Sequence, residues 1–185
     1  MMDKQSYNKN LPEIFTSLPL ENYQRVFKGK RFDVYTLDLN KRKRELIIHP
    51  GAVVIVPILD KDHLIMIRNQ RFAVGKELWE LPAGTLEPNE SPLETAGREL
   101  IEETGYKAGK ITELTHFYTT PGICNELMYA YLATDLTPGK QALEDTEQIT
   151  VEIVSWQKAL QMARDGIIID GKTLAALLFY QAFFR

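Results

Sequence analysis

Two glutamates, Glu99 and Glu103, stand four residues apart in a segment that carries the signals of a helix. On a helix, residues at that spacing lie one turn apart on the same face, so the two carboxylates lie close together. Like charges at this spacing destabilise a helix unless something neutralises them. A hard divalent cation, above all Mg²⁺, prefers such oxygen ligands and would supply the neutralising charge.

The alternative interpretation is an acidic helix face in contact with solvent, which is the usual meaning of a Glu-rich helix. Two features argue against it. The acidic face contains a single arginine, Arg98, rather than interspersed lysines, and it follows the L-P-A-G turn that ends at Gly84. A tight glycine turn brings main-chain carbonyls close to the helix. We therefore expect a metal site on this face, with Arg98 and Glu102, four residues apart, able to pair.

The helix has clear ends in the sequence. Ser91 is expected as the N-cap, Pro92 as the first helical residue, and Glu94 as the partner of Ser91 in a capping box. Gly105 supplies the left-handed residue that ends the helix. At about 100° per residue the helix separates into two faces. The expected apolar face comprises Leu93, Ala96, Gly97, Leu100, Ile101 and Thr104, and the expected polar face comprises Glu94, Thr95, Arg98, Glu99, Glu102 and Glu103.

The fixed residues around this helix form a longer motif. Gly84 is followed by five residues, Glu90, seven residues and then R-E-L-I-E-E-T-G, which ends at Gly105. This arrangement resembles the complete Nudix hydrolase box. Tyr106 stands at the final aliphatic position of the box, a departure that affects packing more than chemistry.

The resemblance implies hydrolysis of a nucleoside diphosphate linked to another group, with Mg²⁺, or Mn²⁺ in its place, as cofactor. It also implies roles for individual residues. The metal ligands would be Glu99, Glu103 and the main-chain carbonyl of Ala83, with Glu102 close to the reaction. Structural support would come from Gly84, Glu90 and Arg98. For Glu90 and Arg98, the alternative is an ordinary surface ion pair, which contributes little stability.

A proline marks a branch of the family. Pro121 lies sixteen residues beyond Gly105, in the loop F-Y-T-T-P-G-I-C-N-E, and a proline at about this distance resembles the ADP-ribose pyrophosphatases. By the same resemblance, Arg71 would lie near the diphosphate, and Glu126 would bind substrate after the proline loop. The run D-G-K-T at residues 170–173 also resembles this branch and GDP-mannose hydrolases.

A long loop, residues 137–148, contains three acids: Glu144, Asp145 and Glu147. Loops of this length in a compact domain are often functional. It resembles the loop that carries the catalytic glutamate of the ADP-ribose pyrophosphatases. Glu147 is the first candidate for the general base or an additional metal ligand, and Asp145 is the second. For each of them the alternative is an exposed loop acid without a role.

Arg44 and Glu45 stand where related enzymes reach the adenine or nearby substrate groups from an N-terminal sheet. In that branch the sheet is often exchanged between the subunits of a homodimer, so these residues would serve the partner's site. The alternative is the charged end of a strand. We expect a polar segment at residues 1–20, a small N-terminal antiparallel sheet used for dimerisation at 21–49, and a Nudix hydrolase domain at 50–185.

Alternating and apolar stretches predict strands before and after the central helix, and helices at the end of the chain. The expected strands span residues 31–39, 44–49, 52–59, 63–68, 78–81, 111–118, 127–133 and 149–154, and the expected helices span 155–164 and 172–184. The strand at 52–59 is nearly all apolar, which predicts burial on both faces. This order gives an α/β/α sandwich around a mixed sheet, the fold that the Nudix box implies.

Composition limits the classes of partner. A net charge of −3 over 185 residues gives no basic footprint for nucleic acid, and no apolar run approaches membrane-spanning length. The first residues lack the apolar core of a signal peptide, and the single cysteine, Cys124, fits a reducing cytoplasm.

The sequence thus predicts an Mg²⁺-dependent pyrophosphatase that cleaves ADP-ribose, or a related nucleoside diphosphate sugar, to AMP and ribose 5-phosphate. Two alternatives stay open. One is GDP-mannose or another nucleotide sugar as the substrate. The other is a sensor of Nudix fold that binds a nucleotide without cleaving it, although such a protein does not need the complete set of carboxylates.

Overall fold

A computed structural model describes residues 22–39 and 41–185. The expected polar segment at residues 1–20 lies outside the described residues. The described residues divide into two compact units: one holds residues 22–39, 41–49 and 122–125, and the other holds residues 50–121 and 126–185.

The N-terminal unit is a three-stranded antiparallel sheet in the order β1-β2-β3. Its strands are β1 (Tyr23–Lys28), β2 (Asp33–Leu39) and β3 (Arg42–Ile48). Residues 122–125 belong to the same unit, because Ile47 donates a hydrogen bond to the carbonyl of Ile123 at 2.8 Å and accepts one from the amide of Asn125 at 3.2 Å. The sequence indicated β2 and β3 but missed β1.

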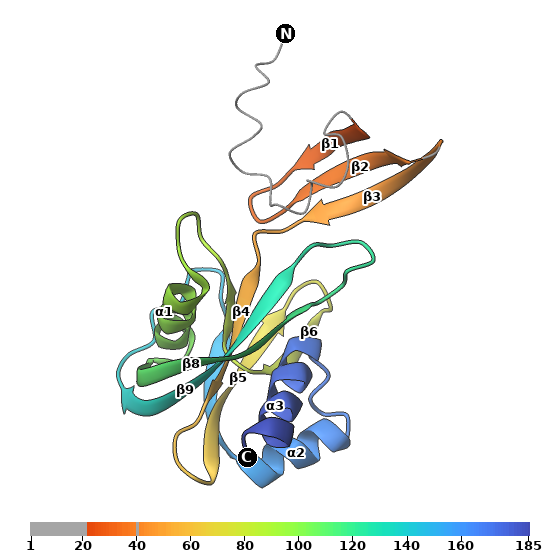
Figure 1. Ribbon diagram of the computed structural model, residues 1–185. Coiled ribbons are helices and arrows are strands. Elements are labelled where there is room, and N and C mark those ends of the chain that lie inside the picture. Colours follow the sequence, from red (N-terminus) through yellow and green to blue (C-terminus); the bar gives the residue numbers. More distant parts are fainter. Residues whose placement is uncertain (1–21, 40) are drawn as a thin grey trace. The chain divides into compact units, whose positions relative to one another are not determined.

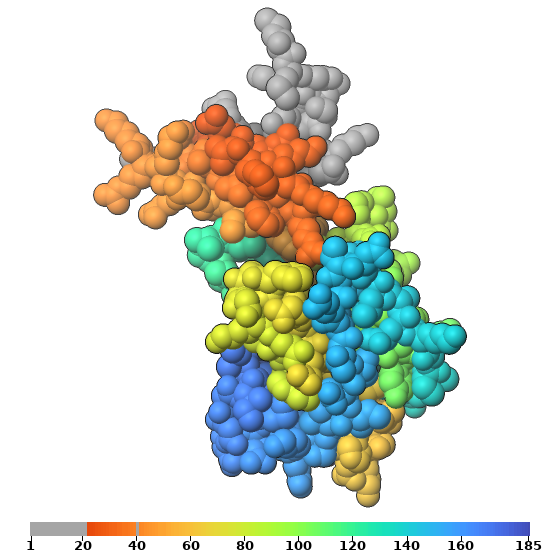
Figure 2. Space-filling model, turned by 180° about the vertical axis from the view of Figure 1, so that it is seen from behind, coloured from red at the N-terminus to blue at the C-terminus, as the bar shows by residue number. Residues whose placement is uncertain are grey.

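The second unit contains two sheets and three helices. Its strands are β4 (Ala52–Pro57), β5 (His63–Arg71), β6 (Lys76–Glu80), β7 (Ala83–Thr85), β8 (Tyr106–Tyr118), β9 (Leu127–Pro138) and β10 (Ile149–Ser155), and its helices are α1 (Pro92–Thr104), α2 (Trp156–Arg164) and α3 (Gly171–Phe183). One sheet has the order β7-β4-β9-β8 and is mixed, because β4 and β9 run parallel while the other neighbours are antiparallel. The other sheet is antiparallel in the order β10-β5-β6. Figure 2 shows the face of the molecule on which the residues near β6 (yellow) and near β10 (blue) are seen.

Strand β4 is the centre of the core and is buried along its whole length, as its apolar sequence predicted. Alternate side chains of a strand point to opposite faces. Val54 and Val56 pack in one cluster with side chains of α2 and α3, whereas Val53 and Ile55 pack in another with Ala96 and Leu100 of α1. Figure 1 shows α1 on one side of the strands and α2 and α3 on the other, so the expected α/β/α sandwich is confirmed.

The central helix begins and ends as the sequence predicted. The Ser91 side chain accepts a hydrogen bond from the amide of Glu94, the Glu94 carboxylate accepts one from the amide of Ser91, and Gly105 takes the left-handed conformation with φ of 75°. The capping residues at both ends are local in sequence, which is why the sequence alone predicted where the helix begins and ends.

The predicted division of α1 into faces was partly wrong. Leu93 and Ile101 are exposed, whereas Thr95, Glu99 and Glu103 are buried. The helix packs against β4, β7 and β8 through the side centred on Ala96 and Leu100, and β7 covers the neighbouring acidic positions. The two glutamates are therefore in the interior of the unit rather than on a solvated face.

Two strands are also much longer than predicted. Strand β8 begins at Tyr106 and β9 continues to Pro138, because the two strands stay paired from one end to the other. This pairing includes polar residues outside the expected strands, and it shortens the acidic loop from residues 137–148 to 139–148. The turn strand β7 was not expected. Among the described residues, no helix has the length and apolar composition that crossing a bilayer requires.

Candidate active site

Glu99 and Glu103 face the turn that leads into β7. The amide of Ala83 donates a hydrogen bond to Glu103 Oε2 at 2.8 Å. The carboxylate of Glu99 lies so close to Gly84 that a Cβ at that position would overlap its carboxyl carbon and both oxygens. Gly84 is therefore required by the close approach of the helix, and the two residues are nearly enclosed, with 9% and 3% of their surfaces exposed.

Replacing Gly84 with alanine is expected to lower turnover and the affinity for divalent metal by about tenfold to a hundredfold, because the new methyl group displaces the Glu99 carboxylate. A metal titration of the rate measures both quantities. Gly97→Ala on α1 is the matched control, since its Cβ would meet only Ile111 Cδ1, at an ordinary 3.7 Å. Equal effects of the two substitutions would contradict the close-approach argument.

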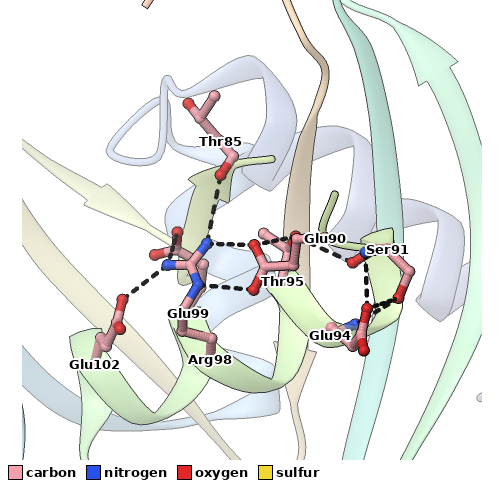
Figure 3. A network of polar contacts seen from close by, with 8 residues as sticks. All are labelled: Thr85, Glu90, Ser91, Glu94, Thr95, Arg98, Glu99 and Glu102. Carbon is pink, nitrogen blue, oxygen red and sulfur yellow. Dashed lines mark hydrogen bonds and ion pairs between the residues drawn. The ribbon is translucent and has the colours of Figure 1, made fainter. Parts of the chain in front are cut away.

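Arg98 contacts three carboxylates, those of Glu90, Glu99 and Glu102 (Figure 3). Its Nε and Nη2 each lie 2.9 Å from Glu90, and its Nη1 lies 2.7 Å from Glu99 and 2.9 Å from Glu102. The pairing of Arg98 with Glu102 expected from their spacing is thus present. Thr95 also donates a hydrogen bond to Glu90 at 2.8 Å, which fixes the supporting carboxylate in turn.

These contacts are more than a surface ion pair. Planar bidentate pairs of arginine and carboxylate are the strong, oriented form of this interaction. The hydrogen bonds from Arg98 hold the pKa of Glu90 below its ordinary value, and the same bonds raise the pKa of Arg98. The consequence is that Glu99 has a defined orientation next to Gly84.

Burial raises the pKa of Glu99 to about 7 and that of Glu103 to about 8. For Glu103, the charge of Glu99 acts in the same direction as burial, and the negative charge of Glu147 adds to the effect on both residues. Desolvation disfavours a charged carboxylate unless an opposite charge compensates it. The site therefore holds carboxylates that protons or a cation would stabilise near neutral pH.

The donor set is one that a hard divalent cation prefers, namely carboxylate oxygens in a partly enclosed site. Among the described residues, no three acidic, histidine or cysteine side chains already converge in a geometry for a metal ion. Arg98 engages Glu99 and the amide of Ala83 engages Glu103, and these two contacts account for the arrangement. A carboxylate has further lone pairs beyond the one used by a single hydrogen bond, so Glu99 and Glu103 remain able to hold a metal.

The acidic loop is tied to the C-terminal end of α1. The side-chain amide of Gln141 donates to the carbonyl of Glu103 at 2.6 Å, and the amide of Ala142 donates to the carbonyl of Glu102 at 3.0 Å. These bonds satisfy carbonyls that the end of a helix leaves without an internal partner. At the other end of the loop, the amide of Gln70 donates to the carbonyl of Gln148 at 3.2 Å.

Within this loop the structure distinguishes the three acids. Glu147 is half-buried and its charge acts on Glu99 and Glu103, whereas Glu144 and Asp145 are exposed. The Glu147 carboxylate also accepts a hydrogen bond from the amide of Glu144 at 3.0 Å, which closes the turn. Glu147 and Asp145 thus have different surroundings, and the choice of Glu147 over Asp145 as the functional residue stays a prediction.

Arg71 has a partner that the sequence analysis missed. Its Nε and Nη2 donate to the two carboxylate oxygens of Glu80 at 2.7 and 2.6 Å, and Lys172 Nζ donates to Glu80 at 2.5 Å. The bond to Glu80 is the largest cause that raises the pKa of Arg71, and the charges of Glu103 and Asp170 act in the same direction. The sequence offered one signal for this contact: Glu80 is a charged residue between Trp79 and Leu81, immediately before the L-P-A-G turn.

Four further residues were predicted to contact the substrate: Pro121, Glu126, Arg44 and Glu45. Pro121 is exposed, and Glu126 accepts a hydrogen bond from the Thr119 hydroxyl at 2.6 Å. Arg44 and Glu45 are exposed on β3 of the N-terminal unit, opposite Leu37 and Thr36 of β2. Their part in substrate binding stays a prediction.

Comparison with known proteins agrees with this geometry. The family model described as the NUDIX domain matches residues 48–177, which include the helix, the turn and the acidic loop. The chain belongs to the Nudix family. The ADP-ribose pyrophosphatase of Bacillus subtilis (strain 168) is 37% identical over 165 residues, with 85% of this chain and 89% of that protein covered.

Two further proteins are similar to this Nudix chain. The GDP-mannose pyrophosphatase of Enterobacter sp. (strain 638) is 32% identical over 165 residues, which cover 79% of this chain and 85% of that protein. A solved structure, described as the crystal structure of ADP compounds hydrolase, superposes with a TM-score of 0.75 at 27% identity, covering 88% of this chain and 91% of that one. The predicted Nudix fold is thus confirmed.

Proposed function

We propose that this Nudix hydrolase cleaves the diphosphate bond of ADP-ribose, or of a closely related nucleoside diphosphate sugar, in a reaction that requires Mg²⁺. The products from ADP-ribose are AMP and ribose 5-phosphate. The observation that carries the proposal is the enclosed pair Glu99 and Glu103, which is held between a glycine turn and an arginine and accompanied by the loop acid Glu147. The similarity to an ADP-ribose pyrophosphatase supports the choice of substrate class.

In this proposal Glu99 and Glu103 hold the metal with the carbonyl of Ala83, and Arg98 keeps Glu99 oriented. A bound divalent cation supplies charge stabilisation to the phosphate oxygens and lowers the pKa of water. Glu147 accepts the proton of the attacking water as general base, with Glu102 close by. Arg71 binds the diphosphate, for which its guanidinium is suited because it presents several donors in one plane.

The remaining parts of the proposal concern the substrate's other groups. Glu126 and Pro121 line the substrate loop, and Arg44 and Glu45 contact the nucleoside. The chain acts as a homodimer with exchanged N-terminal sheets, which would bring these last two residues to the partner's site. We place the enzyme in the cytoplasm, since the sequence has a single cysteine.

A phosphorus NMR time course with ADP-ribose and Mg²⁺ tests the function. The expected result is loss of the diphosphate signals and growth of two phosphomonoester signals. A protein that binds ADP-ribose without this change would be a sensor instead. GDP-mannose is the second candidate substrate. The rates of hydrolysis of GDP-mannose and ADP-ribose at equal concentration distinguish the two, and a faster rate with GDP-mannose would identify it as the better substrate.

Stability should depend on pH and metal in a linked way. In the folded protein the pKa of Glu99 is about 7 and that of Glu103 is about 8, whereas the ordinary value is 4.5. Between pH 4.5 and these raised values, the folded protein therefore binds more protons than the unfolded one. The stability contributed by these protons is fully present below pH 4.5 and is lost as pH rises through about 7 and 8, so the free energy of unfolding without metal should fall by several kcal/mol between pH 5 and 8.5.

Mg²⁺ competes with those protons, so it should raise the urea midpoint more at pH 8.5 than at pH 6. Urea unfolding at both pH values, with EDTA and with Mg²⁺, measures the four conditions. Metal stabilisation that is equal at the two pH values would speak against a metal bound by these carboxylates.

A further inference from the structure

Glu80 is the most enclosed carboxylate described in the second unit, with no exposed surface. It is held by two cations: Arg71 donates to both of its oxygens at 2.7 and 2.6 Å, and Lys172 donates to Oε2 at 2.5 Å. The cations themselves are less buried, since the side chain of Arg71 is 38% exposed and that of Lys172 is 13% exposed. The Glu80 carboxylate is thus fully buried, whereas the two cationic side chains that it binds are partly exposed.

The same place joins β6 to the start of α3. Asp170 caps the helix through the amide of Thr173 at 3.0 Å and also accepts a bond from Lys172 at 3.0 Å. The buried hydroxyl of Thr173 accepts a hydrogen bond from the amide of Leu81 at 2.8 Å. Successive residues Glu80 and Leu81 are therefore bonded to successive residues of α3, which makes the junction rigid.

This junction is continuous with the acidic pair. Only Leu81 and Pro82 separate Glu80 from Ala83, whose amide binds the Glu103 carboxylate. The charge of Glu103 also acts on Arg71. The position of the Arg71 guanidinium relative to Glu103 is consequently set by one short, doubly tethered stretch of chain.

We propose that Glu80 is a positioning residue, which holds the guanidinium of Arg71 in the plane and place at which its outer donors meet the diphosphate of the substrate. This inference rests on the proposed function. The guanidinium has five N–H donors and spends two on Glu80, so donors remain on its far edge. A side chain already held in its binding orientation loses less entropy when the anion arrives.

A role in stability alone explains the arrangement poorly. Buried ion pairs cost desolvation energy, and apolar residues of similar volume often stabilise a protein as well or better. An apolar pair here would leave no cation beside the acidic centre. The bidentate contact fixes the direction of a planar group, and direction matters for binding an anion.

The first test is Glu80→Gln, with Glu77→Gln on the same strand, β6, as its match. Glu80→Gln should raise the KM for ADP-ribose about tenfold and change kcat less than about threefold, because binding in ground and transition states is lost equally. Glu77→Gln, which removes the β6 carboxylate that pairs with Arg68 of β5, should leave both constants unchanged. An unchanged KM in Glu80→Gln would overturn the proposal.

A double-mutant cycle shows whether Glu80 acts through Arg71. Arg71→Ala alone and Arg71→Ala with Glu80→Gln should have the same KM, whereas independent contributions would multiply and contradict the proposal. If Glu80→Gln fails to fold, Arg71→Lys replaces it, since lysine keeps the charge opposite Glu80 but cannot make the two-pronged contact. Arg71→Lys should also raise KM about tenfold, and a normal KM would equally count against the idea.

Binding of inorganic pyrophosphate to the metal-free protein gives a readout apart from catalysis. Calorimetry should find affinity weakened several-fold in Glu80→Gln and unchanged in Glu77→Gln. If the unaltered protein hydrolyses no nucleoside diphosphate sugar yet shows this difference, the proposed function fails while the positioning role stands. If it hydrolyses ADP-ribose and both variants bind pyrophosphate normally, the positioning role alone fails.

Discussion

A Glu103→Gln protein is expected to lose turnover of ADP-ribose on the order of a thousandfold, which corresponds to the several kcal/mol that a metal supplies to a phosphoryl transition state. Glutamine keeps the shape of the side chain and can still accept the hydrogen bond from Ala83. It removes the charge that a divalent cation needs. Steady-state rates over a wide range of Mg²⁺ concentration measure the loss, and rates equal to the original at saturating Mg²⁺ would refute the metal site.

The same substitution should leave the fold stable, or make it more stable when metal is absent. At pH 8.5 the buried Glu103 carboxylate carries a charge that burial opposes, and glutamine has no charge to desolvate. We expect the urea midpoint in EDTA to rise and the stabilisation by Mg²⁺ to disappear. Glu113→Gln, on the exposed part of β8, is the control and should change neither property.

A Glu147→Gln protein should lose about 10²- to 10⁴-fold in kcat, the usual contribution of a general base. Asp145→Asn is the matched variant, since it lies in the same loop two residues earlier but is exposed. We expect its kcat to stay within about twofold of the original, as surface substitutions usually have small effects. The reverse order of effects would assign the base to Asp145.

The dependence on Mg²⁺ separates the two roles considered for Glu147. If it serves as the base alone, Glu147→Gln lowers kcat and leaves the half-saturating Mg²⁺ concentration unchanged. If it is an additional ligand, the half-saturating concentration rises together with the loss of kcat. Both outcomes are read from one set of metal titrations.

Local signals explain which parts of the fold could be predicted. The ends of α1 depend on residues within one turn, such as Ser91 and Glu94, and were placed correctly. Burial of β4 on both faces also follows from composition alone. The far ends of β8 and β9 do not, because their polar residues are paired by continuation of the hairpin rather than by an apolar pattern.

The candidate site divides in the same way. Glu99, Glu103 and Arg98 lie within one motif, so their spacing revealed that they belong together. Their burial could not be anticipated, since it arises from the turn at Ala83 and Gly84 packing onto the helix. Glu80 was missed because its partner Lys172 is 92 residues away in the chain, and only the packing of α3 against the end of β6 brings the charges together.

The N-terminal unit is assembled from two distant stretches of chain, since residues 122–125 hydrogen bond to β3. Grafting this unit onto another protein would therefore require both segments. A fragment that ends at residue 49 would lack residues 122–125. Chimeras that exchange residues 22–49 between relatives should therefore exchange residues 122–125 as well. Otherwise β3 of one protein would have to hydrogen bond to Ile123 and Asn125 of another.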